Sequence, residues 1–154
     1  MRLERLVMEN FGPFSGRAEL DFSRLDDIFL ISGKTGAGKT TIFDAICFAL
    51  YGKVPGSRGD HPTRLRSDHA VDGGGCFVSL EFSLGGKRFL AERCPRQERP
   101  KKRGEGTVSI DETLALFEIT GSTKTLSTSK KTEGDARLKE LIGLEAEEFF
   151  KIVL

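Results

Sequence analysis

The sequence predicts an α/β fold in which a mixed sheet surrounds one buried helix and a further β region is antiparallel. Residues 28–31 form a short, wholly apolar run, which is typical of a strand buried on both faces. A glycine-rich stretch follows at 33–38, and residues 39–51 then have helical character with almost no polar face. Farther along, residues 78–84 alternate apolar and polar side chains, as a half-buried strand does.

Local signals place the elements around this centre. Residues 3–10 and 17–22 are predicted as strands joined by a turn at Gly12 and Pro13. Gly52 is placed to end the helix in a left-handed conformation, and a loop is expected from there to residue 75. Gly85 and Gly86 form a two-residue turn, which pairs the strand at 78–84 with a return strand at 87–93.

The last third of the chain has weaker signals. A basic loop is expected from 95 to 106, followed by strands near 114–119 and 124–126. Leu138, Leu141 and Ile142 have helical spacing that Gly143 ends, and a second short helix begins near residue 145. The chain stops inside an apolar run, so we expect a piece of a longer polypeptide.

Composition excludes several classes of protein. The 154 residues fit one domain, and the net charge of +1 means that any nucleic-acid contact must come from a local basic patch. The three cysteines lie far apart, so neither a disulfide framework nor a zinc site is indicated. The N-terminus lacks the apolar run of a signal peptide, and no apolar run is long enough to span a membrane. We therefore expect a cytoplasmic protein without membrane contact.

One motif carries chemistry. Residues 33–40 match the phosphate-binding loop of P-loop NTPases completely, reading Gly33, Lys34, Thr35, Gly36, Ala37, Gly38, Lys39 and Thr40. Glycines let the backbone curl so that its N–H groups face a polyphosphate, and the following helix adds its positive dipole end. Lys39 is expected to neutralise the β and γ oxygens, and Thr40 to ligate magnesium, with Thr41 alongside. The predicted ligands are therefore ATP and magnesium.

The acidic residue that hydrolysis also needs is not evident. Glu81 follows an apolar strand pattern, but it alternates with Val78, Leu80 and Phe82 as a solvent-facing residue does. We therefore expect Glu81 on the surface and predict no catalytic residue within this chain.

Several segments together resemble one family. These segments are residues 8–14, 29–52, 65–70, 80–82, 97–106 and 143–153. On these segments the chain is similar to the SbcC family of DNA-repair ATPases, relatives of the SMC proteins.

The resemblance implies that residues 1–154 are the N-terminal lobe of an ABC-type ATPase head, truncated before the glutamine loop and coiled coil. Its partners would be the C-terminal lobe of the same protein, a second head in a homodimer, an SbcD-type nuclease and DNA. The implied function is ATP binding, and hydrolysis once both lobes meet, during double-strand-break or hairpin processing near the nucleoid.

Further residues are candidates for contacts in such a head. Asn10 is a candidate for the base or ribose side of the site, and Arg66 for coupling DNA to the nucleotide. A cluster of basic residues has two interpretations: it contacts the phosphate backbone of DNA, or it is a solvated loop. The candidates for DNA contact are Arg64, Arg99, Lys101, Lys102 and Arg103, and the same charge cluster includes Arg93 and Arg96.

Two other classes of function remain open. A self-contained P-loop kinase or NTPase would need an acidic strand end and a lid within these residues. A non-catalytic nucleotide-binding piece would need only the phosphate-binding loop.

Overall fold

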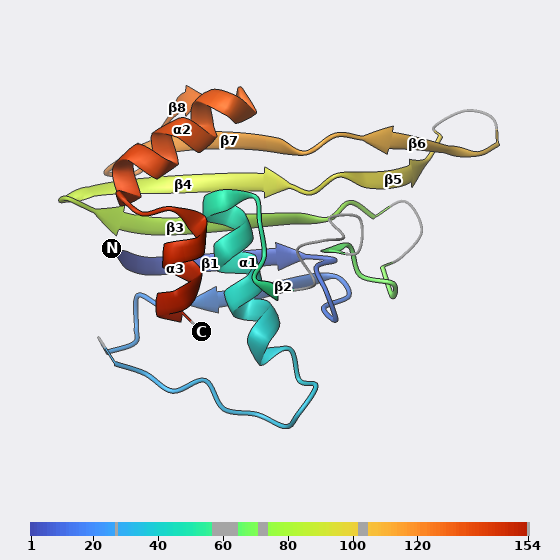
Figure 1. The fold of residues 1–154 in the computed structure, drawn as a ribbon, viewed down its shortest axis with the longest axis horizontal. Coiled ribbons are helices and arrows are strands. Elements are labelled where there is room, and N and C mark those ends of the chain that lie inside the picture. The colour runs from blue at the N-terminus through green and yellow to red at the C-terminus, as the bar shows by residue number, and fades with distance from the viewer. Residues whose placement is uncertain (27, 57–64, 71–73, 102–104, 154) are drawn as a thin grey trace.

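A computed structural model of the chain describes residues 1–26, 28–56, 65–70, 74–101 and 105–153 (Figure 1). These residues form one six-stranded sheet, a two-stranded extension and three helices. The strand order is β2-β1-β3-β4-β7-β8, and every neighbouring pair is antiparallel. The strands are β1 (Arg2–Glu9), β2 (Arg17–Asp21), β3 (Phe77–Leu84), β4 (Lys87–Cys94), β7 (Thr113–Thr120) and β8 (Thr123–Thr128).

The helices cover one face of the sheet (Figure 1). Helix α1 (Lys39–Tyr51) packs on β3 and β4, α2 (Lys131–Ile142) packs on β7 and β8, and α3 (Ala146–Val153) packs on α1. The α/β class is confirmed. Within the described residues the sheet is antiparallel throughout, whereas a mixed sheet was expected, because the apolar run at 28–31 pairs with no strand there.

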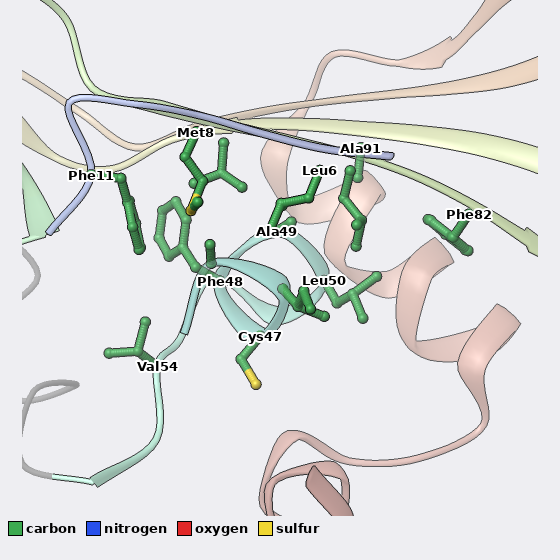
Figure 2. Packing of buried hydrophobic residues seen from close by; sticks show 14 of the residues in the cluster. Leu6, Met8, Phe11, Cys47, Phe48, Ala49, Leu50, Val54, Phe82 and Ala91 are labelled. Carbon is green, nitrogen blue, oxygen red and sulfur yellow. The ribbon is translucent and has the colours of Figure 1, made fainter. Parts of the chain in front are cut away.

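Helix α1 lies at the centre of the core, as its sequence predicts. Its buried residues run from Thr41 to Leu50 with the exception of Phe43. Figure 2 shows Phe48 and Ala49 on the side of α1 that meets the sheet. Phe48 packs there against Phe11, with ring centroids 5.9 Å apart. Removing this much apolar surface from water supplies most of the stability of the domain.

The predicted strand at residues 28–31 is wrong for the described chain. These residues are not in a strand, and Ile28 and Leu30 are 92% and 88% exposed. An apolar run becomes a buried strand only when neighbouring strands satisfy its backbone groups on both sides. No described segment supplies such a neighbour, although the Phe29 ring does contact Phe22.

The predicted basic loop at residues 95–106 also needs correction. Strands β5 (Gln97–Pro100) and β6 (Thr107–Ile110) pair there and extend β4 and β7 into an arm beyond the sheet (Figure 1). The buried Gln97 side chain holds the base of this arm, because it accepts from the Cys76 N–H at 2.8 Å and donates to the Cys76 carbonyl.

Arg93 does not belong to the exposed charge cluster. Its side chain is completely buried and forms ion pairs of 2.6 Å with both Glu112 and Asp135. Residues Phe89, Ala91 and Arg93 alternate along β4 and face the helices, so the strand register places this arginine in the core.

No helix of the described chain covers the opposite face of the sheet (Figure 1), which carries charged side chains as well as the buried Leu90. Glu81 lies there with its carboxylate within 4.0 Å of Arg5, Arg88 and Lys124. The three cations are 44–49% exposed, whereas the Glu81 side chain between them is only 16% exposed. Glu81 therefore lies on the side of the sheet that no helix covers, as predicted, but its side chain is largely shielded from solvent.

Burial keeps two ionisable side chains of α1 in their neutral form. Loss of water raises the pKa of the Cys47 thiol to about 12, and the nearby Asp44 carboxylate adds to the effect. Burial likewise raises the pKa of the Tyr51 hydroxyl to about 12. Because only the thiolate is a good nucleophile, Cys47 acts as a small core residue at neutral pH. None of the described helices is long and apolar enough to cross a membrane.

Candidate nucleotide-binding site

The phosphate-binding loop leads directly into the first turn of α1. Gly36 and Gly38 both have left-handed backbone angles, with φ of 81° and 85°. The Ala37 N–H donates to the Lys34 carbonyl at 3.1 Å, which closes the curl just before the helix begins at Lys39. The helix start therefore leaves its free N–H groups at the loop, where an anion is stabilised.

The Lys39 ammonium lies over the same loop. It donates to the carbonyl oxygens of Gly33 at 2.5 Å and Lys34 at 2.8 Å, and both contacts are exposed to solvent. No acidic side chain among the described residues forms an ion pair with it. A cation held only by solvent-exposed carbonyls is free to exchange them for stronger, charged acceptors.

A cavity of about 380 Å³ opens at the N-terminal end of α1. This volume falls within the range of small-molecule sites, roughly 300–1,000 Å³. Six of the nine predicted residues at 33–41 line it, and Gly33, Lys34 and Ala37 instead shape the loop through backbone contacts. The lining residues are Thr35, Gly36, Gly38, Lys39, Thr40 and Thr41 together with Pro13.

Thr40 is the residue that the sequence predicts as a magnesium ligand. It lies in the first turn of α1, is exposed and lines the cavity. Across the described part of the chain, no cluster of three His, Cys, Asp or Glu side chains could hold a metal by itself.

Asn10 has other partners than the expected base or ribose. Its side chain is 4% exposed, its amide nitrogen donates to the Gly75 carbonyl at 2.9 Å, and its amide oxygen accepts from the Gly16 N–H at 2.9 Å. With φ of 49°, it also holds a left-handed backbone conformation that asparagine tolerates better than most residues. These bonds fix the loop that follows β1.

Arg66 contacts the loop that follows β1 and is not part of the phosphate-binding loop. Its backbone forms an isolated bridge with Phe11, and its Nε donates to the Gly74 carbonyl at 3.1 Å. It is absent from the lining of the cavity. Arg64 lies outside the described residues, as do Lys102 and Arg103. Lys101 is exposed in the arm, and Arg99 is in β5.

Sequence reasoning missed Pro13 and Phe14. Both follow β1, and Pro13 lines the cavity while the Phe14 ring lies against Gly38. The pattern identified a turn at this point and gave no sign of what the turn would contact. The only usable signal is the placement of an aromatic residue next to a glycine-proline turn.

A family profile described as "AAA domain" matches residues 5–153. The chain belongs to this family. Curated relatives that are named as the SbcC component of the SbcCD nuclease align with all of it: the protein from Vibrio cholerae is 40% identical and the one from Treponema pallidum is 37% identical. The resemblance to SbcC is confirmed. The chain spans 15% and 14% of the length of these two relatives.

A solved structure gives a weaker match. The SMC head domain from Thermotoga maritima is 20% identical, with a TM-score of 0.44 over 81% of this chain and 39% of that one.

Proposed function

We propose that this chain binds magnesium-ATP and forms the N-terminal lobe of an SbcC-type ATPase head. The observation that carries the proposal is the complete phosphate-binding loop at the start of a buried helix. Beside that loop lie a Lys39 ammonium without an ion-pair partner in the described chain and a cavity lined by loop residues. The shared name of the curated relatives supports the assignment to a subunit of a nuclease complex.

Each residue of the loop has a distinct part in binding. The N–H groups around Gly36 and Gly38 surround the phosphates, and the start of α1 stabilises their charge. Lys39 exchanges its two carbonyl acceptors for oxygens of the β and γ phosphates. Magnesium, when bound, neutralises the charge of the phosphates, and the Thr40 hydroxyl is the protein ligand placed to hold it.

Hydrolysis requires more than this lobe. No carboxylate of the described residues lines the cavity, and Glu81 is occupied by three cations on the uncovered face of the sheet. We assign the group that orients the attacking water to the C-terminal lobe of the same protein. The exposed apolar residues Ile28 and Leu30 precede the loop and are suited to pair with that lobe.

The remaining partners follow from the same assignment. A second head would dimerise with this one around two ATP molecules, an SbcD-type nuclease would cut, and DNA would be the substrate of double-strand-break or hairpin processing. A cytoplasmic, nucleoid-associated location goes with this role. A self-contained kinase or NTPase is disfavoured, because the cavity has neither a carboxylate nor a lid among the described residues.

A substitution at Thr40 tests the magnesium part of the proposal. Thr40→Ala is expected to remove most of the gain in ATP affinity that magnesium gives, while leaving affinity in EDTA within about twofold, because only the metal ligand is lost. Calorimetric titration with ATP, with and without magnesium, measures both values.

Thr35→Ala is the matched control, since Thr35 lines the same cavity but precedes the helix. It should keep the full effect of magnesium. An equal loss in both variants would contradict the assignment of Thr40.

The arm formed by β5 and β6 is proposed to contact DNA. Lys101 is exposed beside its tip, and the sequence continues through Lys102 and Arg103. The arm extends away from the rest of the sheet (Figure 1), so a duplex can reach it without displacing other elements. Each phosphate contact that is lost should flatten the plot of log affinity against log salt by about 0.9.

Reversing the charge of Lys101, Lys102 and Arg103 together is therefore expected to lower DNA affinity and reduce the salt slope by about 2–3 in the complete head. Fluorescence anisotropy with a short duplex at several salt concentrations measures this. Lys87→Glu, at the opposite end of β4, is the control and should leave the slope unchanged. An unchanged slope in the triple variant would rule out the arm as the DNA contact.

A further inference from the structure

The loop at residues 10–16 lies between two other segments. On one side, its Gly12 N–H donates to the Leu65 carbonyl at 2.8 Å, and its Asn10 carbonyl accepts from the Ser67 N–H at 2.7 Å. Phe11 and Arg66 form the bridge between these bonds. The loop is therefore paired by backbone hydrogen bonds to residues 65–67, and the two segments hold a fixed register.

The other side of the same loop rests on the phosphate-binding loop. A Cβ atom built on Gly38 would lie 2.7 and 2.9 Å from two carbons of the Phe14 ring and 3.3 Å from Pro13. A Cβ on Gly12 would lie 2.7 Å from the Thr41 methyl carbon. Real Cβ atoms do not come this close to a ring, so Phe14 and Gly38 are in direct van der Waals contact.

The turn that carries Phe14 is itself fixed. The Phe14 N–H donates to the Phe11 carbonyl at 3.0 Å, and Phe11 is buried against Phe48 in the core. Phe14 is half-buried and packs on the same core cluster. The ring that contacts Gly38 is therefore itself held in place by the core. Residues 32–37 of the phosphate-binding segment are, by contrast, exposed.

We propose that Phe14 is a positioning residue for the phosphate-binding loop. Its ring holds Gly38 in the left-handed conformation, which aims the last N–H groups of the loop at a bound phosphate. This inference rests on the proposed ATP binding and adds a residue outside the loop motif to the site. A preorganised loop binds its anion more tightly, because the ordering is done before the ligand arrives.

The same contact joins ATP binding to residues 65–67. Ligand at the cavity restrains Gly38, Gly38 restrains Phe14, and the loop at 10–16 shares backbone hydrogen bonds with Leu65 and Ser67. ATP should therefore slow hydrogen exchange at the N–H groups of Gly12 and Ser67, although neither group belongs to the phosphate-binding motif.

Phe14→Ala is expected to weaken ATP affinity about tenfold or more, because several N–H donors to a charged phosphate lose their alignment. Phe14→Leu, which keeps an apolar side chain against Gly38, should recover most of the affinity. ATP at saturating concentration should protect the Gly12 and Ser67 N–H groups in the wild-type chain and in Phe14→Leu, but not in Phe14→Ala. Titration calorimetry and exchange measured by NMR give the two readouts.

Phe150→Ala is the matched control, because Phe150 is also half-buried against the core but lies on α3, where it contacts Tyr51. It should lower stability without changing ATP affinity or the protection of Gly12 and Ser67. ATP binding by Phe14→Ala as tight as by Phe150→Ala would overturn the inference and leave the proposed function intact. Failure of the wild-type chain to bind ATP would overturn both.

Discussion

Arg93→Ala is expected to lower the free energy of unfolding of the chain by about 3 kcal/mol, the lower end of the range for breaking a buried ion pair. The Arg93 side chain is completely buried, and its two terminal nitrogens lie 2.6 Å from Glu112 and from Asp135. Its Nε donates to the Ala49 carbonyl at 3.3 Å near the end of α1. The substitution removes all of these bonds and leaves a cavity beside Phe48.

The lower end of the range is expected because the carboxylates keep some compensation. Glu112 and Asp135 are 22% and 32% exposed, and Lys131 lies 3.8 and 3.1 Å from them. Urea denaturation followed by circular dichroism measures the change. Arg96→Ala is the control, since Arg96 is 61% exposed and should change the free energy by less than about 0.5 kcal/mol. Equal effects at both positions would contradict the role given to Arg93.

Lys39→Ala is expected to weaken ATP binding about 100-fold or more, because two charge-assisted hydrogen bonds of roughly 1.5–3 kcal/mol each are lost. Stability without nucleotide should hardly change, since the ammonium bonds only two solvent-exposed carbonyls. In the wild-type chain, ATP at 100 times its dissociation constant should add about 2.7 kcal/mol to the free energy of unfolding. Thermal melting with and without ATP should show this gain only in the wild-type protein.

Lys34→Ala is the matched control for this experiment. Lys34 belongs to the same loop and is exposed, and only its carbonyl contacts Lys39. Its removal should change ATP affinity by no more than about threefold, as for an exposed charge. If Lys34→Ala and Lys39→Ala weakened binding equally, general electrostatic attraction would explain the result and the specific place of Lys39 would be wrong.

Helix α1 and the loop before it could be predicted from the sequence because local signals decide them. The predicted helix at 39–51 has the observed bounds, since a glycine on each side marks its ends and its residues are apolar almost throughout. The hairpin at Gly85 and Gly86 was predicted for the same reason, because a short turn and an alternating pattern fix the register of two strands.

Burial against distant segments could not be predicted in the same way. The run at 28–31 has the composition of a buried strand, but a strand also needs neighbours, and the described chain provides none. Whether this run forms a strand depends on residues outside the local pattern. The arm at β5 and β6 was missed because charged residues and Pro100 hide its strand pattern.

The positions of Arg93 and Phe14 were missed for different reasons. Arg93 follows Phe89 and Ala91 at a spacing of two, so the strand period already placed it on the buried face. The run of basic residues that begins at Arg93 instead led to its assignment to the exposed charge cluster. For Phe14 there was no comparable signal, because its contact with Gly38 joins two turns that only the fold brings together.

We propose that this chain binds the phosphates of ATP but depends on another segment for hydrolysis. The most direct test is the rate of ATP turnover by the purified chain in magnesium, with its melting temperature measured in the same solution. We predict a higher melting temperature with ATP, which Lys39→Ala abolishes, and no turnover above background. Turnover that disappears in Lys39→Ala would contradict the claim, because it would require a complete catalytic site within these 154 residues.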